Sequence, residues 1–140
     1  MTREHVFVYG TLRRGAGHPM HETLARMSQF VGLAHYQGVL YDLGPYPGAV
    51  RDPRGRSTVW GELYAVLPGQ PLLSMLDRYE GCTSLDPKPH VFLRDRVTVT
   101  RDDGTVEQAW IYLYAGALTR ARHIPGGDYL RRASRDRSPT

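Results

Sequence analysis

The stretch VFLRDRVTVTRDDGTVEQAWIYLYAG, residues 91–116, carries the clearest fold signal in the chain. Two runs rich in β-branched and aromatic residues flank the sequence Asp-Asp-Gly at 102–104, which is typical of a turn. This arrangement predicts a β-hairpin with one strand on each side of the turn. The hairpin is the first indication that strands dominate the fold.

Strand-like sequence recurs at four other places: residues 5–9, 30–44, 45–50 and 57–67. The first of these, HVFVY, predicts a buried strand that ends at Gly10. Gly32 and Gly38 interrupt the second and indicate bulges or tight bends. The prolines of the third, PYPGAV, favour an edge strand or a connection. Several glycines within strands fit a strongly bent sheet.

Two short helices are predicted, at residues 20–27 after Pro19 and at residues 71–79. The second has an apolar stripe at helical spacing, and Gly81 is placed to end it in a left-handed conformation. The stripe consists of Leu72, Met75, Leu76 and Tyr79. Because helices do not alternate regularly with strands, the pattern argues against a doubly wound sheet. The expected fold class is α+β (mixed), a small curved or barrel-like β-sheet with a few surrounding helices.

Length and composition place the chain among ordinary globular proteins. It has 140 residues, 41% of them hydrophobic and 23% charged, which predicts one domain with a sizeable core. The sequence has no apolar run of membrane-spanning length and no signal-peptide pattern at its start. A single cysteine, Cys82, forms no internal disulfide. We therefore expect a cytoplasmic protein without a membrane partner.

The net charge of +4 is confined to the C-terminal end. From Arg120 onward there are six arginines and two aspartates, and the rest of the chain is balanced. We expect a domain over residues 1–118 and a basic, partly ordered segment over 119–140. A basic tail can bind nucleic acid, but a solvated terminus is the more common case, and we expect no nucleic-acid partner.

Glu80 is the most informative carboxylate. It falls at the end of the second predicted helix, where the partial negative charge favours a bound proton. A carboxyl group that holds its proton more tightly is a better general base near neutral pH. The alternative is a solvated glutamate without a role. Glu62, in a predicted strand, is either a second site carboxylate or a residue that is exposed or paired with an arginine.

Other candidate groups carry weaker signals. Cys82 needs a base and a lowered pKa to act as a nucleophile, and His90 lies in the same loop. His18 and His21 are three residues apart, but two histidines without an evident third ligand do not make a metal site. GTLRRGAG, residues 10–17, lacks the spacing and the lysine of a phosphate-binding loop. No metal and no cofactor are expected.

An ordered set of short motifs resembles the gamma-glutamyl cyclotransferase-like superfamily, which includes gamma-glutamylamine cyclotransferases and avirulence-induced proteins. The motifs are VYGTLRRG, LYDLGPYPGAV, VWGELYAV, LDRYEGC, LRDRVTV and AWIYLY, followed by IPGGDY. Together they span about residues 5–130. The resemblance implies a small mixed α/β barrel with helices around it, in agreement with the pattern of strands.

The resemblance also implies site residues. The family's catalytic glutamate falls on Glu80, and its substrate-holding glycine turn falls on Tyr9, Gly10, Thr11 and Leu12. Tyr129 is a further candidate contact. The implied reaction is attack of the substrate α-amine on its own γ-glutamyl carbonyl. It releases 5-oxoproline and an amine or amino acid. The resemblance thus implies an acyltransferase or lyase of glutathione or γ-glutamyl metabolism, and we expect the protein to be a monomer or a homodimer.

Two departures from the family pattern concern the substrate. Many members carry a tyrosine where this chain has Phe92, and the loop from residue 81 to residue 91 is long, with two prolines. Both lie near Glu80 and can reshape the pocket for the leaving amine. The other open function is a non-catalytic small-molecule binding module on the same fold, which would keep the glycine turn without needing Glu80.

Overall fold

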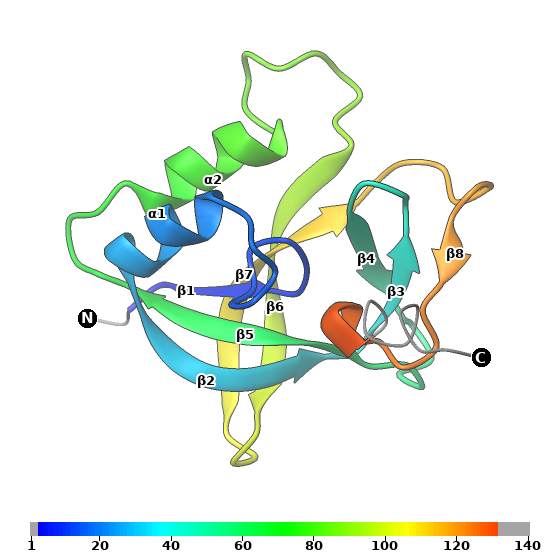
Figure 1. The fold of residues 1–140 in the computed structure, drawn as a ribbon, viewed down its shortest axis with the longest axis horizontal. Coiled ribbons are helices and arrows are strands. Elements are labelled where there is room, and N and C mark those ends of the chain that lie inside the picture. Colours follow the sequence, from blue (N-terminus) through cyan, green and yellow to red (C-terminus); the bar gives the residue numbers. More distant parts are fainter. Residues whose placement is uncertain (1–2, 132–140) are drawn as a thin grey trace.

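The computed structural model describes residues 3–131 (Figure 1). Its eight strands form a barrel and a small second sheet, accompanied by two labelled helices and a further helical turn at residues 129–131. In chain order the elements are β1 (His5–Val8), α1 (Met20–Met27), β2 (Ser28–Tyr36), β3 (Gly38–Asp42), β4 (Pro47–Arg51), β5 (Val59–Val66), α2 (Leu72–Glu80), β6 (Phe92–Arg101), β7 (Val106–Tyr114) and β8 (Arg122–His123).

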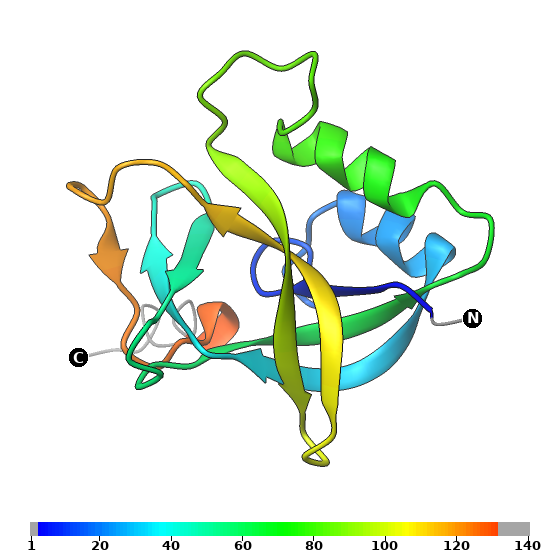
Figure 2. The same cartoon turned by 180° about the vertical axis from the view of Figure 1, so that it is seen from behind.

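Five strands close the barrel in the order β1-β5-β2-β6-β7, and a parallel contact between Val6 of β1 and Trp110 of β7 completes it. The predicted hairpin is confirmed, since β6 and β7 pair antiparallel from Phe92–Tyr114 to Thr100–Val106. In Figure 2 this long hairpin crosses the front of the molecule. The expected α+β class with a barrel-like sheet is confirmed.

Gly32 and Gly38, which were predicted to interrupt the second strand-like stretch, have different structural consequences. At Gly32 the register of β2 against β5 shifts, which is the bulge that the sequence indicated. At Gly38 the chain leaves the barrel and enters the second sheet, whose order is β4-β3-β8. The proline-rich segment was predicted to be an edge strand or a connection. It forms β4, an edge strand of this sheet.

Alternation along the barrel strands separates two apolar clusters. On β1, Phe7 joins the cluster that includes Leu63 and Ile111, whereas Val6 and Val8 face the helices. Both helices lie on the same side of the barrel in Figure 1, and Leu24, Leu72 and Leu76 are fully buried there. Helix packing therefore fixes the position of the C-terminal end of α2.

Helix α2 ends as predicted. Gly81 is its C-cap, with φ 73° and ψ 34° in the left-handed region, and its N–H donates to the Arg78 carbonyl. The helix begins at Leu72, one residue after Pro71. Of the predicted stripe, Leu72 and Leu76 are buried but Tyr79 is 40% exposed. The last turn of the helix therefore extends beyond the core.

Residues 122–131 pack against the rest of the fold. Strand β8 pairs with β3, Ile124 is buried, and the Gly127 carbonyl accepts a hydrogen bond from the Trp60 N–H at 2.8 Å. Residues 132–140 of the expected basic segment lie outside the described residues. Within residues 3–131, no helix combines the length and apolar character needed to cross a bilayer.

Candidate active site

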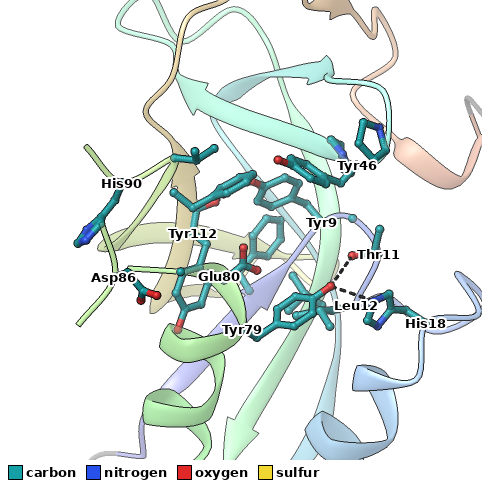
Figure 3. Close-up of a pocket in the computed structure, with 18 of the residues that line it drawn as sticks. Tyr9, Thr11, Leu12, His18, Tyr46, Tyr79, Glu80, Asp86, His90 and Tyr112 are labelled. Carbon is teal, nitrogen blue, oxygen red and sulfur yellow. Dashed lines mark hydrogen bonds between the residues drawn. The ribbon is translucent and has the colours of Figure 1, made fainter. Parts of the chain in front are cut away.

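A pocket of about 570 Å³ opens between the end of β1, the end of α2, the start of β4 and the loop between α2 and β6. Five of the six predicted site residues line it: Tyr9, Gly10, Thr11, Leu12 and Glu80 (Figure 3). Tyr129 is not among the lining residues and instead packs against the apolar cluster that contains Phe7. The fold thus brings together two segments about 70 residues apart in the sequence, the loop after β1 and the C-terminal end of α2.

The Glu80 carboxyl group lies in the middle of the pocket as Figure 3 draws it. No hydrogen bond or ion pair to this carboxyl occurs within the described residues 3–131. Burial raises its pKa from a usual value of 4.5 to about 7. The direction agrees with the sequence prediction, but the cause is loss of solvent and not the helix end invoked there. A carboxyl poised near neutrality can both accept and return a proton.

The raised pKa of Glu80 predicts a pH-dependent stability. Between pH 4.5 and 7 the folded protein holds this proton while the unfolded chain has lost it. The free energy of unfolding contributed by Glu80 therefore falls as pH rises across that window, by roughly 3 kcal/mol in total. Glu80→Gln, which is neutral at every pH, lacks this loss. We expect the variant to match the wild type at pH 4.5 and to exceed it in urea unfolding at pH 8.

Tyr9 joins the barrel to the small sheet. Its hydroxyl donates to the Tyr112 carbonyl at 2.6 Å and accepts from the Ala49 N–H at 3.1 Å. Burial raises the pKa of Tyr9, so the phenol stays protonated. With both hydrogen bonds made, the hydroxyl holds the end of β1 in place and the ring contributes to the pocket wall.

The loop after Tyr9 offers backbone groups more than side chains. The Leu12 side chain is buried in the core, and its carbonyl accepts from His21 Nδ1 at 2.8 Å. No hydrogen bond within residues 3–131 uses the N–H groups of Gly10, Thr11 or Leu12 as donors. Three such amides in a pocket wall are suited to bind a carboxylate or a developing oxyanion.

Gly10 is required for a reason that the sequence did not show. The expected turn is present, since the Gly10 carbonyl accepts from the Arg13 N–H at 3.1 Å, but Gly10 is not among the glycines with positive φ. A Cβ at this position would lie 2.6 Å from Pro47 Cγ, at the start of β4. The ring of Pro47 therefore occupies the space of a side chain, and the loop packs directly against the small sheet.

This contact predicts the effect of Gly10→Ala. The added methyl group should push the loop away from Pro47 and destabilise the fold by about 1–3 kcal/mol, as overpacking does. Removing the ring in Gly10→Ala/Pro47→Ala should restore most of that loss in urea unfolding. Gly126→Ala is the matched control, since its Cβ would meet no atom within 4 Å and its φ is not positive. A Gly10→Ala protein as stable as this control would contradict the packing.

A buried ion network holds the chain immediately after this loop. Arg13 is 7% exposed and Glu62 4%, and Arg13 Nε lies 3.3 Å from Glu62 Oε2. A second guanidinium nitrogen lies 2.9 Å from Asp128 Oδ1. Glu62 also accepts from the Arg14 N–H and from the Tyr64 hydroxyl. Glu62 is therefore paired with an arginine, one of the predicted alternatives, and it does not line the pocket.

Comparison with known proteins shows to which family this chain belongs. The family described as "Gamma-glutamyl cyclotransferase, AIG2-like" matches residues 6–131. The chain belongs to this family. A Vibrio cholerae relative, provisionally named a gamma-glutamylcyclotransferase, is 37% identical over 128 residues, which cover 91% of this chain and 96% of the relative. The gamma-glutamylcyclotransferase family protein YtfP of Escherichia coli K12 is 32% identical over 127 residues, with the same coverage.

Solved structures agree with the cyclotransferase family assignment. The crystal structure of an aig2-like protein from Mus musculus superposes with a TM-score of 0.68 and 26% identity, covering 92% of this chain and 89% of that one. The solution structure of Escherichia coli YtfP gives a TM-score of 0.62 with 30% identity, covering 92% and 98%. The predicted family and its barrel fold are both confirmed.

His18, which lines the pocket, is engaged in hydrogen bonds. His18 Nδ1 accepts from the Met20 N–H at 3.0 Å, so a neutral His18 carries its proton on Nε2, which lies 3.1 Å from the Tyr79 hydroxyl. That hydroxyl is also 3.5 Å from Thr11 Oγ1. The described residues contain no group of three His, Cys, Asp or Glu side chains placed to hold a metal.

The remaining predicted positions lie around the same pocket. Phe92 lines it and is buried, in contact with Tyr46 and Tyr114. Cys82 makes a weak contact with the Asp77 carbonyl at 3.7 Å, and burial raises the pKa of its thiol, which disfavours a thiolate nucleophile. Asp86, which was not predicted as a site residue, lines the pocket from the loop after α2.

Proposed function

We propose that this protein is a gamma-glutamyl cyclotransferase that converts a γ-glutamyl amide into 5-oxoproline and a free amine. The observation that supports this proposal best is the position of Glu80. It combines a raised pKa with a place in the pocket across from the loop of Gly10, Thr11 and Leu12. Membership of the cyclotransferase family makes this the natural reaction for such a group.

The reaction is an intramolecular acyl transfer. The α-amine nitrogen of the substrate bonds to its own γ-carbonyl carbon, and the bond from that carbon to the leaving nitrogen breaks. The attacking ammonium nitrogen loses two protons and the leaving nitrogen gains two, so the overall proton count is unchanged. Glu80 accepts protons from the first nitrogen and delivers them to the second, acting as base and then as acid.

In the proposed reaction, the loop after β1 stabilises negative charge on the substrate. Amides of Gly10, Thr11 and Leu12 bind the glutamyl α-carboxylate or the oxyanion that develops on the γ-carbonyl oxygen. The pocket folds the substrate so that amine and carbonyl meet, which needs no external nucleophile. With a single cysteine as a free thiol, the cytoplasm remains the proposed compartment.

The test is 5-oxoproline release from a panel of γ-glutamyl amino acids and γ-glutamyl amines. We expect 5-oxoproline and free amine in equal amounts from at least one member. If folded protein binds a γ-glutamyl compound by calorimetry but releases no 5-oxoproline from any, the protein is a binding module and the enzymatic proposal is wrong.

A further inference from the structure

The pocket has two sides, one formed by the loop after β1 and the other by the loop between α2 and β6. The second side carries the carboxylate of Asp86. In Figure 3, Thr11 and Tyr79 lie on one side of Glu80, and Asp86 and His90 lie on the other. Asp86 and His90 come from the loop between α2 and β6, which projects beyond the barrel in Figures 1 and 2. If the glutamyl end occupies the side of the β1 loop, as the proposed function requires, the leaving amine extends toward Asp86.

The Asp86 carboxylate is held in a fixed orientation. Both the N–H and the hydroxyl of Thr83 donate to Asp86 Oδ2, at 2.8 and 2.7 Å. These hydrogen bonds lower the pKa of Asp86, so the group is ionised at neutral pH. Within residues 3–131 no hydrogen bond uses Asp86 Oδ1, which remains available to a ligand.

At the pocket wall, no lysine or arginine of residues 3–131 balances Asp86, and the basic side chain that interacts with it is His90. Among the described residues, the lining set contains no lysine and no arginine, and its other ionisable groups besides the tyrosines are Glu80, His18 and His90. Lys88 is in the same loop but is exposed and is not part of the lining. A leaving group that ends in a carboxylate would therefore meet a carboxylate of the protein.

His90 adds an unpaired nitrogen beside Asp86. Its Nε2 is buried and has no hydrogen-bond partner in the described structure. A neutral imidazole with its proton on Nδ1 accepts a hydrogen bond at Nε2. The structure thus leaves a covered polar atom without a hydrogen-bond partner in the same loop as Asp86.

We propose that Asp86 selects γ-glutamyl substrates whose leaving amine carries a second, positively charged amino group and no carboxylate, such as a mono-γ-glutamyl diamine. This inference rests on the proposed function. Asp86 acts as a specificity-determining residue, with His90 beside it, and Glu80 carries out the proton transfers. A fixed carboxylate at the pocket wall discriminates between substrates mainly through its repulsion of the wrong charge.

The experiment compares three γ-glutamyl amides of similar length, made from 1,5-diaminopentane, hexylamine and 6-aminohexanoate. We expect the wild type to favour the diamine derivative over the carboxylate derivative in kcat/KM. Asp86→Asn should lower the ratio of kcat/KM for the diamine amide to that for the hexyl amide by about tenfold. Asp86→Lys should favour the 6-aminohexanoate derivative instead.

Asp103→Asn is the matched control, since Asp103 also accepts from a nearby backbone N–H, that of Thr105 at 2.8 Å, but lies in the β6–β7 turn. Its ratios should equal those of the wild type. Ratios measured within one protein preparation do not depend on the fraction folded. Turnover with no preference for the diamine, or with a preference that Asp86→Asn retains, overturns the selection by Asp86 and leaves the enzyme intact. Absence of turnover with these three amides overturns this inference, and only absence of turnover with the whole panel of γ-glutamyl amino acids and amines overturns the proposed function as well.

Discussion

Glu80→Gln is expected to lower 5-oxoproline release by about 10²–10⁴-fold, the range that general acid–base catalysis by one side chain contributes. Glutamine keeps the size and the hydrogen-bonding reach of glutamate, but it cannot accept the proton of the attacking amine. The loss should fall on kcat, because the glutamyl group would still be held by the loop of Gly10, Thr11 and Leu12. Steady-state release from the best substrate of the panel measures it.

Two comparisons make this result specific. Glu22→Gln removes an exposed carboxyl from the first turn of α1, outside the pocket, and should leave release unchanged. The stability of Glu80→Gln at pH 8 should equal or exceed that of the wild type, which separates lost chemistry from lost structure. If a folded Glu80→Gln protein retains wild-type release, the proton acceptor is another group and the assignment of Glu80 is wrong.

The parts of the fold that local patterns determine were predictable. The β6–β7 hairpin follows from two apolar runs around Asp-Asp-Gly, and the end of α2 follows from Gly81. Because Gly81 fixes where the helix stops, it also fixes Glu80 at the helix end. The position of the candidate base could therefore be inferred from sequence, although the burial that raises its pKa could not.

Contacts between distant segments were beyond sequence reasoning. Arg13 and Asp128 are 115 positions apart, and nothing local marks them as partners. The contact of Gly10 with Pro47 likewise depends on how the small sheet docks against the barrel. Tyr79 shows a related limit, since helical spacing assigned it to the core stripe while its hydroxyl contacts His18 and Thr11. Periodicity identifies a face of a helix but not where the core beneath that face ends.

The ion network of Arg13 leads to the second large effect. Arg13→Met is expected to lower the free energy of unfolding by about 3–5 kcal/mol, because it leaves the buried Glu62 carboxylate without its charged partner. Methionine fills much of the same volume, so the loss measures an uncompensated charge more than a cavity. Urea unfolding at neutral pH, with unchanged dependence on denaturant concentration, measures the change.

The double variant Arg13→Met/Glu62→Gln tests that explanation. Glutamine removes the charge and keeps a carbonyl oxygen for the Arg14 N–H and the Tyr64 hydroxyl, so the double variant should be more stable than Arg13→Met alone. Arg51→Met is the matched control, since Arg51 and Asp95 form an exposed ion pair whose loss should cost at most about 1 kcal/mol. A cost for Arg13→Met no larger than for Arg51→Met would show that the network does not hold the fold. Because Arg13 directly follows Leu12, a large cost would instead support our inference that Glu62 of β5 and Asp128 of the C-terminal segment help to hold the proposed substrate loop in place.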